Sequence, residues 1–427
     1  LRALWQGRGA VDIAALLDSV EDSARQAAVF RTLPKDLAAD VFSYLPGPTQ
    51  ATLARSFADG ELQQIFDALH LDDAADFLEE LPANLVTRIL RSASPQRRMA
   101  VNALLRYPAD SAGSVMTPEF VSLRPGDTVR QALDTIRRTG IHKETIYTCY
   151  VTDQRRLLGI VSAKDLMTTA DDILIRDLMQ TEIISVTTHT DKEEVAQLFT
   201  KYDFLAIPVL DQDERMVGIV TFDDAMDVMV EEATEDITKM AAVSPSEKTY
   251  FEVSAWEHAK RRIPWLLVLM FSSIITGTII TRYEDAFAAI PLLVSFIPML
   301  MDTGGNCGSQ SSTLVIRGLA LSEIHFKDIF KVIFKEFRIS IIVGAVLALT
   351  NGVRILIQYH NPNLALVIAL SLIATVIISK LIGCILPLVA SKVHLDPAIM
   401  ASPLITTLVD TFSILIYFNI ASLMFRL

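Results

Sequence analysis

Residues 299–312 read MLMDTGGNCGSQSS and follow directly on the apolar run IPLLVSFIP at 290–298. Residues 299–312 contain an aspartate, an asparagine, a glutamine, three glycines and three serines, inside a segment that is otherwise apolar enough to enter a bilayer. Non-helical backbone at membrane depth is tolerated only where it is buried in protein or lines a water-filled cavity. We therefore expect a break in a membrane helix that lines a cavity. Tight packing through small residues is the alternative, and it explains Gly304 and Gly308 but not Asn306 or Gln310.

The stretch belongs to a C-terminal part in which apolar segments of about 20 residues or more recur, enough to cross a bilayer. Five spans are predicted, at 263–281, 286–316, 334–357, 364–390 and 399–425. Basic residues gather before the first span, between the second and third, and between the fourth and fifth: Lys260, Arg261, Arg262, Lys327, Lys331, Lys335, Arg338 and Lys392. The positive-inside rule then places the N-terminus in the cytosol and the C-terminus outside a plasma membrane, which in a bacterium is the inner membrane.

Two carboxylates in these spans are candidates for function, because a charge near the bilayer centre costs at least about 2.5–3.5 kcal/mol. Asp302 opens the polar stretch, and Asp410 lies midway along the fifth span. Ser402, Thr406 and Asp410 follow one another at four-residue spacing and so share one helix face, which suits the wall of a water-filled path. An ion pair with Lys380 is the alternative, although it would explain one carboxylate and not two.

The first 262 residues are acidic, with 42 Asp and Glu against 28 Lys and Arg, whereas the remainder has eight acids and ten bases. This balance argues against a nucleic-acid partner and favours cations. Residues 1–108 show apolar residues at helical spacing, interrupted by Leu-Pro at 33–34, 45–46 and 81–82. The pattern predicts a small all-α domain built from short helices.

Residues 109–235 contain an internal repeat of about 60 residues with alternating strand and helix patterns. Segments beginning at Met116 and Met179 correspond, and Gly159 and Gly218 each precede Ile-Val and an aspartate six residues later. The repeat resembles a tandem pair of CBS (cystathionine-β-synthase) domains, which implies a regulatory sensor, often of adenine nucleotides. A plain dimerisation module is an equal alternative. Asp165 and Asp224 stand where the resemblance places ribose-binding aspartates, so ATP is a candidate ligand.

Two acidic helix faces stand out in this soluble half. One carries Asp224, Asp227, Glu231 and Glu235, with only Lys239 near enough to compensate, and the other carries Asp72, Asp76 and Glu79, flanked by Asp73 and Glu80. A single acidic helix is more often a solvated surface. Two such faces in neighbouring domains favour a divalent cation between them, because carboxylate oxygens suit Mg²⁺ or Ca²⁺.

Taken together, the all-α domain, the CBS pair, a connecting helix at 236–262 and five spans at 263–427 predict a multidomain membrane protein. With PMLMDTGGNCGSQSSTLVIRGLA at 298–320 and DPAIMASPLITTLVD at 396–410, the whole chain resembles the MgtE family of magnesium channels. The resemblance implies a homodimer with a pore whose ion-selecting residue is Asp410, lined also by Gly304, Gly305, Asn306, Ser402 and Thr406. It also implies cytosolic sensor sites for Mg²⁺ at Asp203, Asp224, Asp227, Glu232, Glu235 and Asp236. Their N-domain counterparts would be among Asp72, Asp73, Asp76 and Glu79.

The expected function is a Mg²⁺ channel for uptake that closes when cytosolic Mg²⁺ binds between the acidic faces. An H⁺- or Na⁺-coupled transporter that uses Asp302 and Asp410 is the first alternative, but the five spans show no inverted repeat. A membrane-tethered nucleotide sensor is the second. An enzyme is the least supported, since no nucleophile–base pairing or phosphate loop stands out. The sequence does not separate Mg²⁺ from Co²⁺, Mn²⁺ or Ni²⁺, because one carboxylate with water ligands accepts several cations.

Overall fold

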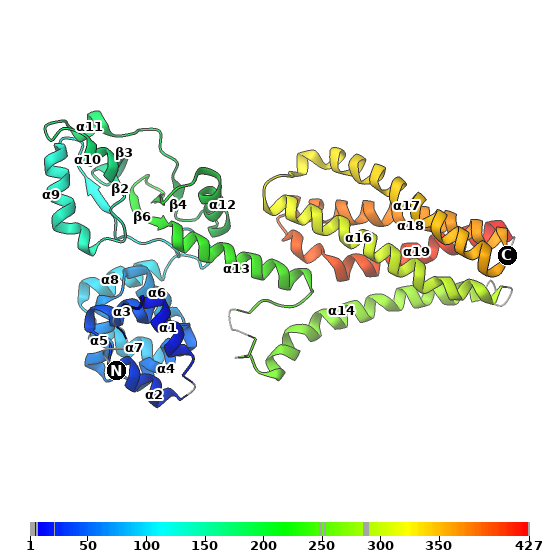
Figure 1. Ribbon diagram of the computed structural model, residues 1–427, viewed down its shortest axis with the longest axis horizontal. Coiled ribbons are helices and arrows are strands. Elements are labelled where there is room, and N and C mark those ends of the chain that lie inside the picture. Colours follow the sequence, from blue (N-terminus) through cyan, green and yellow to red (C-terminus); the bar gives the residue numbers. More distant parts are fainter. Residues whose placement is uncertain are drawn as a thin grey trace. The chain divides into compact units, whose positions relative to one another are not determined.

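The computed structural model describes residues 5, 7–20, 22–246, 250–251, 253–284 and 290–425. The chain divides into two compact units, Leu1–Met229 and Val230–Leu427, and the boundary falls inside helix α13 (Phe222–Met240). The first unit holds a helical domain and two small sheets, and the second is a bundle of long helices (Figure 1). The predicted fold class, an all-α domain, a CBS pair and a helical membrane domain, is confirmed.

Short helices form the N-terminal domain. Their bounds are α1 Ala10–Asp18, α2 Ser23–Phe30, α3 Lys35–Ser43, α4 Gly47–Ser56, α5 Asp59–Ala68, α6 Leu71–Glu79, α7 Ala83–Ser92 and α8 Pro95–Leu104. The recurring prolines start helices: Pro34, Pro46 and Pro82 are the N-cap residues of α3, α4 and α7. Proline suits a helix start because it has no N–H to leave unpaired and its φ angle is already near −65°.

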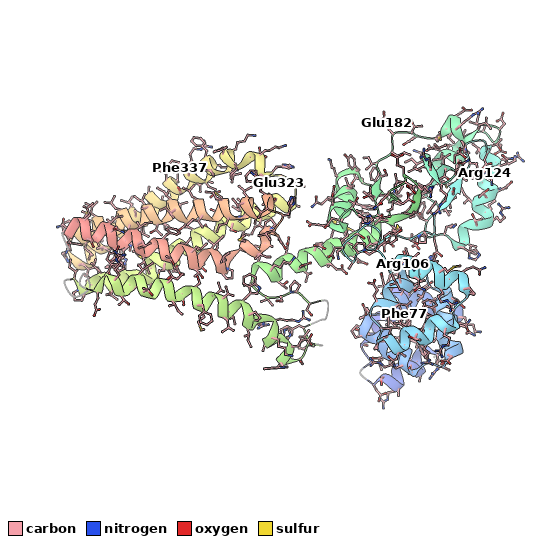
Figure 2. All side chains as sticks on the ribbon, turned by 180° about the vertical axis from the view of Figure 1, so that it is seen from behind. Phe77, Arg106, Arg124, Glu182, Glu323 and Phe337 are labelled. Atoms are coloured by element: carbon pink, nitrogen blue, oxygen red, sulfur yellow. The ribbon has the colours of Figure 1, made fainter. Side chains whose placement is uncertain are left out.

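The core of this domain is apolar and aromatic. Phe42 contacts Phe30 and Phe77 edge-on, with ring centroids 6.0 and 4.9 Å apart, and all three rings are buried. Figure 2 labels Phe77 among the short helices. Fully burying a side chain of this size contributes about 1.5–3 kcal/mol to the free energy of folding. The three buried rings therefore stabilise the packing of α2, α3 and α6 against one another.

The two CBS repeats each form a three-stranded sheet of the same topology. In the first, β1 (Val121–Leu123) pairs in parallel with β2 (Thr148–Asp153), which pairs antiparallel with β3 (Arg156–Ser162). In the second, β4 (Val186–Thr187), β5 (Ala206–Leu210) and β6 (Met216–Thr221) repeat this order. The accompanying helices are α9 Val129–Thr139, the 3₁₀ turn η2 Gly140–His142, α10 Ala163–Thr168, α11 Ile175–Leu178 and α12 Lys192–Tyr202.

The repeated methionines and glycines join the two repeats to each other. A Cβ on Gly159 would lie 2.6 Å from the sulfur of Met179, and one on Gly218 would lie 2.8 Å from the sulfur of Met116. Each repeat therefore inserts its first methionine against the glycine of the other repeat. Both glycines are needed because a methyl group would displace that methionine.

The connecting helix expected at 236–262 is not one helix. Helix α13 ends at Met240, residues 241–246 are not helical, and α14 (Ala255–Arg282) begins after Ser254, whose hydroxyl accepts from the backbone N–H of Glu257. Positive φ at Ala242 and the proline at 245 end the helical path. Residues 255–262 are the first two turns of the helix that continues into the first predicted span.

The remaining helices pack as a bundle (Figure 1). After the 3₁₀ turn η3 Pro291–Phe296 they are α16 Ile297–Ala320, η4 Phe326–Asp328, α17 Ile329–Tyr359, α18 Pro362–Lys392, η5 Pro397–Met400 and α19 Ser402–Phe425. Within the described residues, four helical stretches are long and apolar enough to cross a membrane: 255–282, 326–359, 362–392 and 397–425. Large apolar side chains such as Phe337 of α17 are exposed along them, as expected of a lipid-facing surface (Figure 2).

Helix α16 shows that the predicted break at 302–312 is wrong. The polar stretch is helical throughout, and the 24 residues of α16 reach about 36 Å at 1.5 Å per residue. The glycines are contact points. A Cβ on Gly304 would lie 2.8 Å from side-chain atoms of Val409 and Ser413, and one on Gly383 of α18 would lie 2.3 Å from the carbonyl oxygen of Gly308. Close packing of α16 against α18 and α19, the alternative reading, therefore explains the glycines.

A buried ion pair holds α16, α17 and α18 together. The Lys380 ammonium lies 3.6 Å from a carboxylate oxygen of Glu336, and both side chains are less than a tenth exposed. The hydroxyl of Ser311 donates to the same Glu336 oxygen at 2.6 Å and accepts from Lys380 at 3.1 Å. Lys380 therefore pairs with Glu336, and the pairing considered for Asp302 or Asp410 is wrong.

Candidate cation sites

Carboxylates from the N-terminal domain and the CBS pair gather within the first unit. Asp72 and Asp73 lie in the first turn of α6, and Asp224 lies in the first turn of α13. Asp72 is 9% exposed, and its Oδ1 has no hydrogen-bond partner among the described residues. Burial, reinforced by the charges of Asp224 and Glu144, raises the pKa of Asp72 well above its usual value. Asp72, Asp73 and Asp224 are therefore close enough for their charges to act on one another, and their role in binding a cation stays a prediction.

Burial also shifts the neighbouring acids. Burial raises the pKa of Asp73 to about 6, against the opposing effect of the His70 charge. The pKa of Asp224 rises to about 7, again mainly through burial, although a hydrogen bond from the Thr221 hydroxyl opposes the shift. Raised carboxyl pKa values of this kind mark a place where negative charge is poorly compensated. Binding of protons or of a cation would lower the electrostatic repulsion among these carboxylates.

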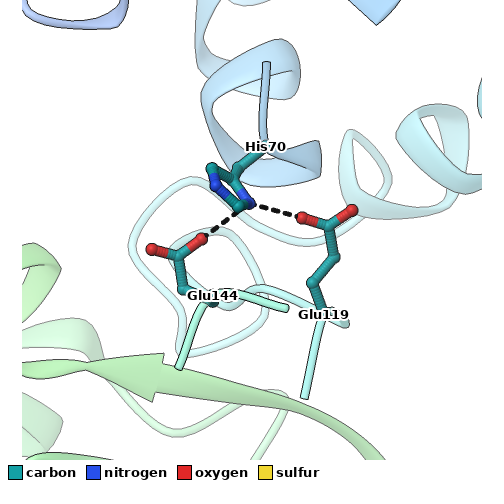
Figure 3. A group of neighbouring side chains, drawn as sticks. All are labelled: His70, Glu119 and Glu144. Atoms are coloured by element: carbon teal, nitrogen blue, oxygen red, sulfur yellow. Dashed lines mark hydrogen bonds and ion pairs between the residues drawn. The ribbon is translucent and has the colours of Figure 1, made fainter. Parts of the chain in front are cut away.

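His70 adds a feature that the sequence did not indicate (Figure 3). As the N-cap residue of α6, it places Nδ1 2.7 Å from Oε2 of Glu119 and 2.9 Å from Oε2 of Glu144. The hydrogen bond to Glu119 and the neighbouring carboxylate of Glu144 raise the pKa of His70 to about 11. Arg97 is a second nearby base, whose charge interacts with Glu119 and Asp72. Besides Lys239, which the sequence indicated, His70 and Arg97 are therefore basic groups close to these acids.

The other predicted residues of this group are more exposed. Asp76 and Glu79 lie on the exposed side of α6, and Asp203 caps the end of α12 with a left-handed φ of 55°. Asp227 is exposed, and burial with the charge of Asp223 raises its pKa. Of these acids, Asp72 is therefore buried, Asp73 and Asp224 are partly buried, and Asp76, Glu79 and Asp227 are exposed.

The two aspartates considered for a nucleotide occupy equivalent positions. Asp165 accepts from the hydroxyl of Ser162 at 2.6 Å, and Asp224 accepts from that of Thr221, each at the start of the helix after the last strand of its repeat. This shared geometry follows from the internal repeat.

The end of α13 makes its own contacts in the second unit. Lys239 forms ion pairs with Glu235 and, at 2.7 Å, with Asp396, which caps the turn η5 ahead of α19. Repulsion from Asp396 adds to burial in raising the pKa of Asp236. Met240 packs against a small apolar cluster of Ile316, Ala398 and Ala401. Glu232 is partly buried on the same helix.

The predicted pore residues divide between two environments. Asp302 and Asn306 are exposed one turn apart on α16, whereas Gly304 is buried against α18 and α19. Thr406 lies against Gly305, where a Cβ would approach its Cγ2 to 3.0 Å, and Asp410 is partly exposed one turn further along α19. The charge of Asp302 acts on Asp410, so both carboxylates belong to one region. The side chain of Ser402 lies outside the described residues.

Comparison with known protein families matches the N-terminal domain, the CBS pair and most of the membrane domain. The sequence model of the MgtE intracellular N domain matches residues 9–110, that of the CBS domain matches 112–172 and 175–231, and that of MgtE, a divalent cation transporter, matches 297–420. The Thermus thermophilus protein named magnesium transporter MgtE is 37% identical over 97% of this chain and 92% of its own length. Its namesake from Bacillus subtilis is 41% identical over 88% of this chain and 81% of its own length.

Two solved structures resemble the first part of the chain. One, described as the cytosolic domain of the Mg²⁺ channel MgtE in complex with ATP, is 39% identical with a TM-score of 0.51, covering 53% of this chain and 93% of that one. The other, the soluble part of a magnesium transporter, is 32% identical with a TM-score of 0.52, covering 54% and 91%. With its apolar helices, this chain is a multi-pass membrane protein that belongs to the MgtE family.

Proposed function

We propose that the protein is a Mg²⁺-selective channel that takes up magnesium across the bacterial inner membrane and closes when cytosolic Mg²⁺ is high. Relatives of this chain that cover nearly its whole length are named magnesium transporters, and one solved relative is described as a Mg²⁺ channel. The basic residues around the spans support a cytosolic N-terminus and an external C-terminus.

The observation that carries the proposed gating is the carboxylate of Asp72, which is buried beside Asp224 and whose Oδ1 has no hydrogen-bond partner among the described residues. Leaving a charge buried without a partner costs several kcal/mol, so the packed arrangement of α6 against the CBS pair is stable only with protons or a cation in place. Mg²⁺ prefers oxygen ligands and is commonly held by one or two carboxylates with water completing its shell. Asp72, Asp73 and Asp224 are the residues we assign to this sensor.

Binding must favour the closed state for the ion to act as a switch. Cytosolic Mg²⁺ stabilises the packed first unit, and its loss lets the acidic residues repel one another and the domains separate. Helix α13 carries Asp224 at its beginning and Lys239 at its end, where Lys239 pairs with Asp396 just before α19. We propose that α13 transmits the change to α19 through the ion pair of Lys239 with Asp396. Further negative charge at the sensor comes from the other predicted acids, which are Asp76, Glu79, Asp203, Asp227, Glu232, Glu235 and Asp236.

For the pore we propose Asp410 as the ion-selecting residue, acting on hydrated Mg²⁺. Asp302, Asn306 and Thr406 belong to the same polar region, and an exposed aspartate and asparagine do not face lipid without a cost of several kcal/mol. This surface therefore faces a second copy of the chain, and the pore runs between the two subunits of a homodimer. Glycines 304 and 305 let α16 approach α19 closely enough to place these side chains together.

ATP is the proposed ligand of the CBS pair, with Asp165 and Asp224 as ribose-binding residues. The support is the relative whose cytosolic domain was solved with ATP, and the equivalent capping positions of the two aspartates.

Flux recordings with the Asp224→Asn variant test the sensor. Currents of the full-length protein in planar bilayers are measured while Mg²⁺ on the cytosolic side is raised. We expect the concentration that half-closes the wild-type channel to rise on the order of tenfold in Asp224→Asn, since couplings of this kind span about 5- to 150-fold. Asp213→Asn, an exposed turn residue, is the matched control. Unchanged closure of Asp224→Asn contradicts the sensor assignment.

An H⁺- or Na⁺-coupled transporter is the second candidate, and the proximity of Asp302 and Asp410 favours it, because a proton can bind such a pair. Discrete single-channel conductance steps support the channel. Uptake that follows an imposed proton or sodium gradient, without such steps, supports the coupled transporter.

A further inference from the structure

The cluster of His70, Glu119 and Glu144 has the composition of a metal centre and lies where three distant segments meet (Figure 3). One ligand atom from each residue lies within 4.8 Å of the others. His70 comes from the N-terminal domain, and both glutamates come from the first CBS repeat, on either side of β1 and α9. Any ion bound by all three would tie the two domains together.

The backbone fixes the two glutamates relative to each other. The N–H of Glu144 donates to the carbonyl oxygen of Glu119 at 2.9 Å, so their side chains leave the chain from adjoining points. All three side chains are partly buried. The backbone therefore holds the two glutamates side by side, and the side chain of His70, the more exposed of the three, reaches them from the start of α6.

The imidazole alone does not satisfy these oxygens. Nδ1 carries at most one hydrogen, which is directed to Oε2 of Glu119 at 2.7 Å. Oε2 of Glu144 is buried and has no hydrogen-bond partner among the described residues, although it lies 2.9 Å from the same nitrogen. Oε2 of Glu144 therefore has no hydrogen of its own and remains for a cation to occupy.

We propose that His70, Glu119 and Glu144 form a regulatory site for a divalent transition-metal ion, of the class of Mn²⁺, Co²⁺ or Zn²⁺. A nitrogen donor with two carboxylates suits these ions, whereas Mg²⁺ prefers oxygen ligands alone. On binding, Nδ1 gives its proton to solvent and donates its lone pair to the metal, and the carboxylates supply the remaining protein ligands. The site is separate from the Mg²⁺ sensor proposed above and does not depend on the gating mechanism.

Mn²⁺ binding to the full-length, chelator-treated protein in detergent tests this site. Millimolar Mg²⁺ is kept present throughout so that oxygen-only sites are filled. Equilibrium dialysis counts the Mn²⁺ retained, and pulsed electron paramagnetic resonance detects coupling between Mn²⁺ and a nitrogen nucleus. We expect one Mn²⁺ per chain with an imidazole nitrogen coupling.

Variants assign that signal to the cluster. His70→Gln should abolish the nitrogen coupling and weaken Mn²⁺ binding on the order of 10- to 100-fold. Glu119→Gln and Glu144→Gln should weaken binding and keep the coupling. His189→Gln, an exposed histidine of the second repeat, should change neither. Thermal unfolding of each variant verifies that it is folded.

Two outcomes overturn the proposal. If Mg²⁺ prevents all Mn²⁺ retention by the wild-type protein, the cluster is an ion pair only. If His70→Gln keeps the nitrogen coupling, the metal lies elsewhere. Neither result bears on closure by Mg²⁺, because binding is read without any flux measurement.

Discussion

The two units of the molecule treat buried charge in opposite ways. In the membrane bundle, Glu336 is buried together with Lys380, and the Ser311 hydroxyl bonds to both. In the first unit, Asp72 is buried to a similar extent beside Asp224, and its Oδ1 has no hydrogen-bond partner among the described residues. Both carboxylates carry the cost of leaving water. Among the described residues, Glu336 forms a direct ion pair with Lys380, whereas Asp72 has only the longer-range charge of Arg97.

The difference separates structural from functional charge. A buried pair completed within the chain depends on no ion and behaves as part of the fold. A buried carboxylate left incomplete makes stability depend on what the solution supplies, which is the requirement for a sensor. Asp410 is partly exposed and also has no pairing with Lys380, which is bound to Glu336, while the charge of Asp302 acts on it.

Replacing Asp410 should have the largest effect on transport. Asp410→Ala removes the proposed ion-selecting carboxylate without touching the Glu336–Lys380 pair, so Mg²⁺ uptake into liposomes should fall by at least about tenfold, equivalent to about 1.4 kcal/mol. The thermal unfolding midpoint should stay close to that of the wild type. Asn419→Ala, an exposed polar position of the same helix, is the control and should transport normally. Uptake that persists in Asp410→Ala rejects the pore assignment.

Breaking the buried pair should have a large effect on stability instead. Lys380→Met leaves Glu336 buried without its cation, which typically costs about 3–5 kcal/mol. The double variant Lys380→Met with Glu336→Gln removes both charges and should recover much of that loss. Thermal unfolding in detergent measures both. If the double variant is as unstable as Lys380→Met, the loss of stability does not come from the uncompensated charge of Glu336, and the prediction is wrong.

At Asp72 the same kind of substitution should act in the opposite direction. Asp72→Asn removes a buried, repelled charge, so in Mg²⁺-free buffer it should stabilise the protein by roughly 1–3 kcal/mol, the range for an unsatisfied buried group. The stabilisation that Mg²⁺ gives the wild type should be smaller in this variant. Asp213→Asn serves as control. Destabilisation of Asp72→Asn without Mg²⁺ removes the contrast between the two units.

The sequence predicted the architecture well, because that architecture rests on patterns with a fixed period. Met116 and Met179, with Gly159 and Gly218, marked the internal repeat, and the structure shows each methionine against the glycine of the other repeat. Helix spacing and hydropathy placed the domains in order. These signals are local, so one sequence is sufficient to read them.

The polar stretch of α16 was misread for a physical reason. Each glycine costs about 1 kcal/mol of helix propensity, and three of them with polar neighbours indicate a break. Close packing at Gly304 and Gly308 overrides that preference and keeps the helix continuous. His70 was missed because its partner Glu119 is 49 residues away, and no spacing along the chain brings the two together.

The smallest effect we predict is on pH dependence. The raised pKa values of Asp73 and Asp224, about 6 and 7, mean that the packed first unit holds protons that the unfolded chain has already lost. The associated stability is present at acidic pH and is lost as pH rises through about 7. Mg²⁺ must displace those protons, so its binding should tighten with rising pH, by on the order of tenfold between pH 6 and 8. Asp224→Asn should flatten this dependence. Calorimetric titration of Mg²⁺ in buffers of different ionisation enthalpy measures the protons released. If the wild type releases no protons near pH 7, these carboxylates are already ionised. The contrast between them and the paired Glu336 would then be weaker than the structure indicates.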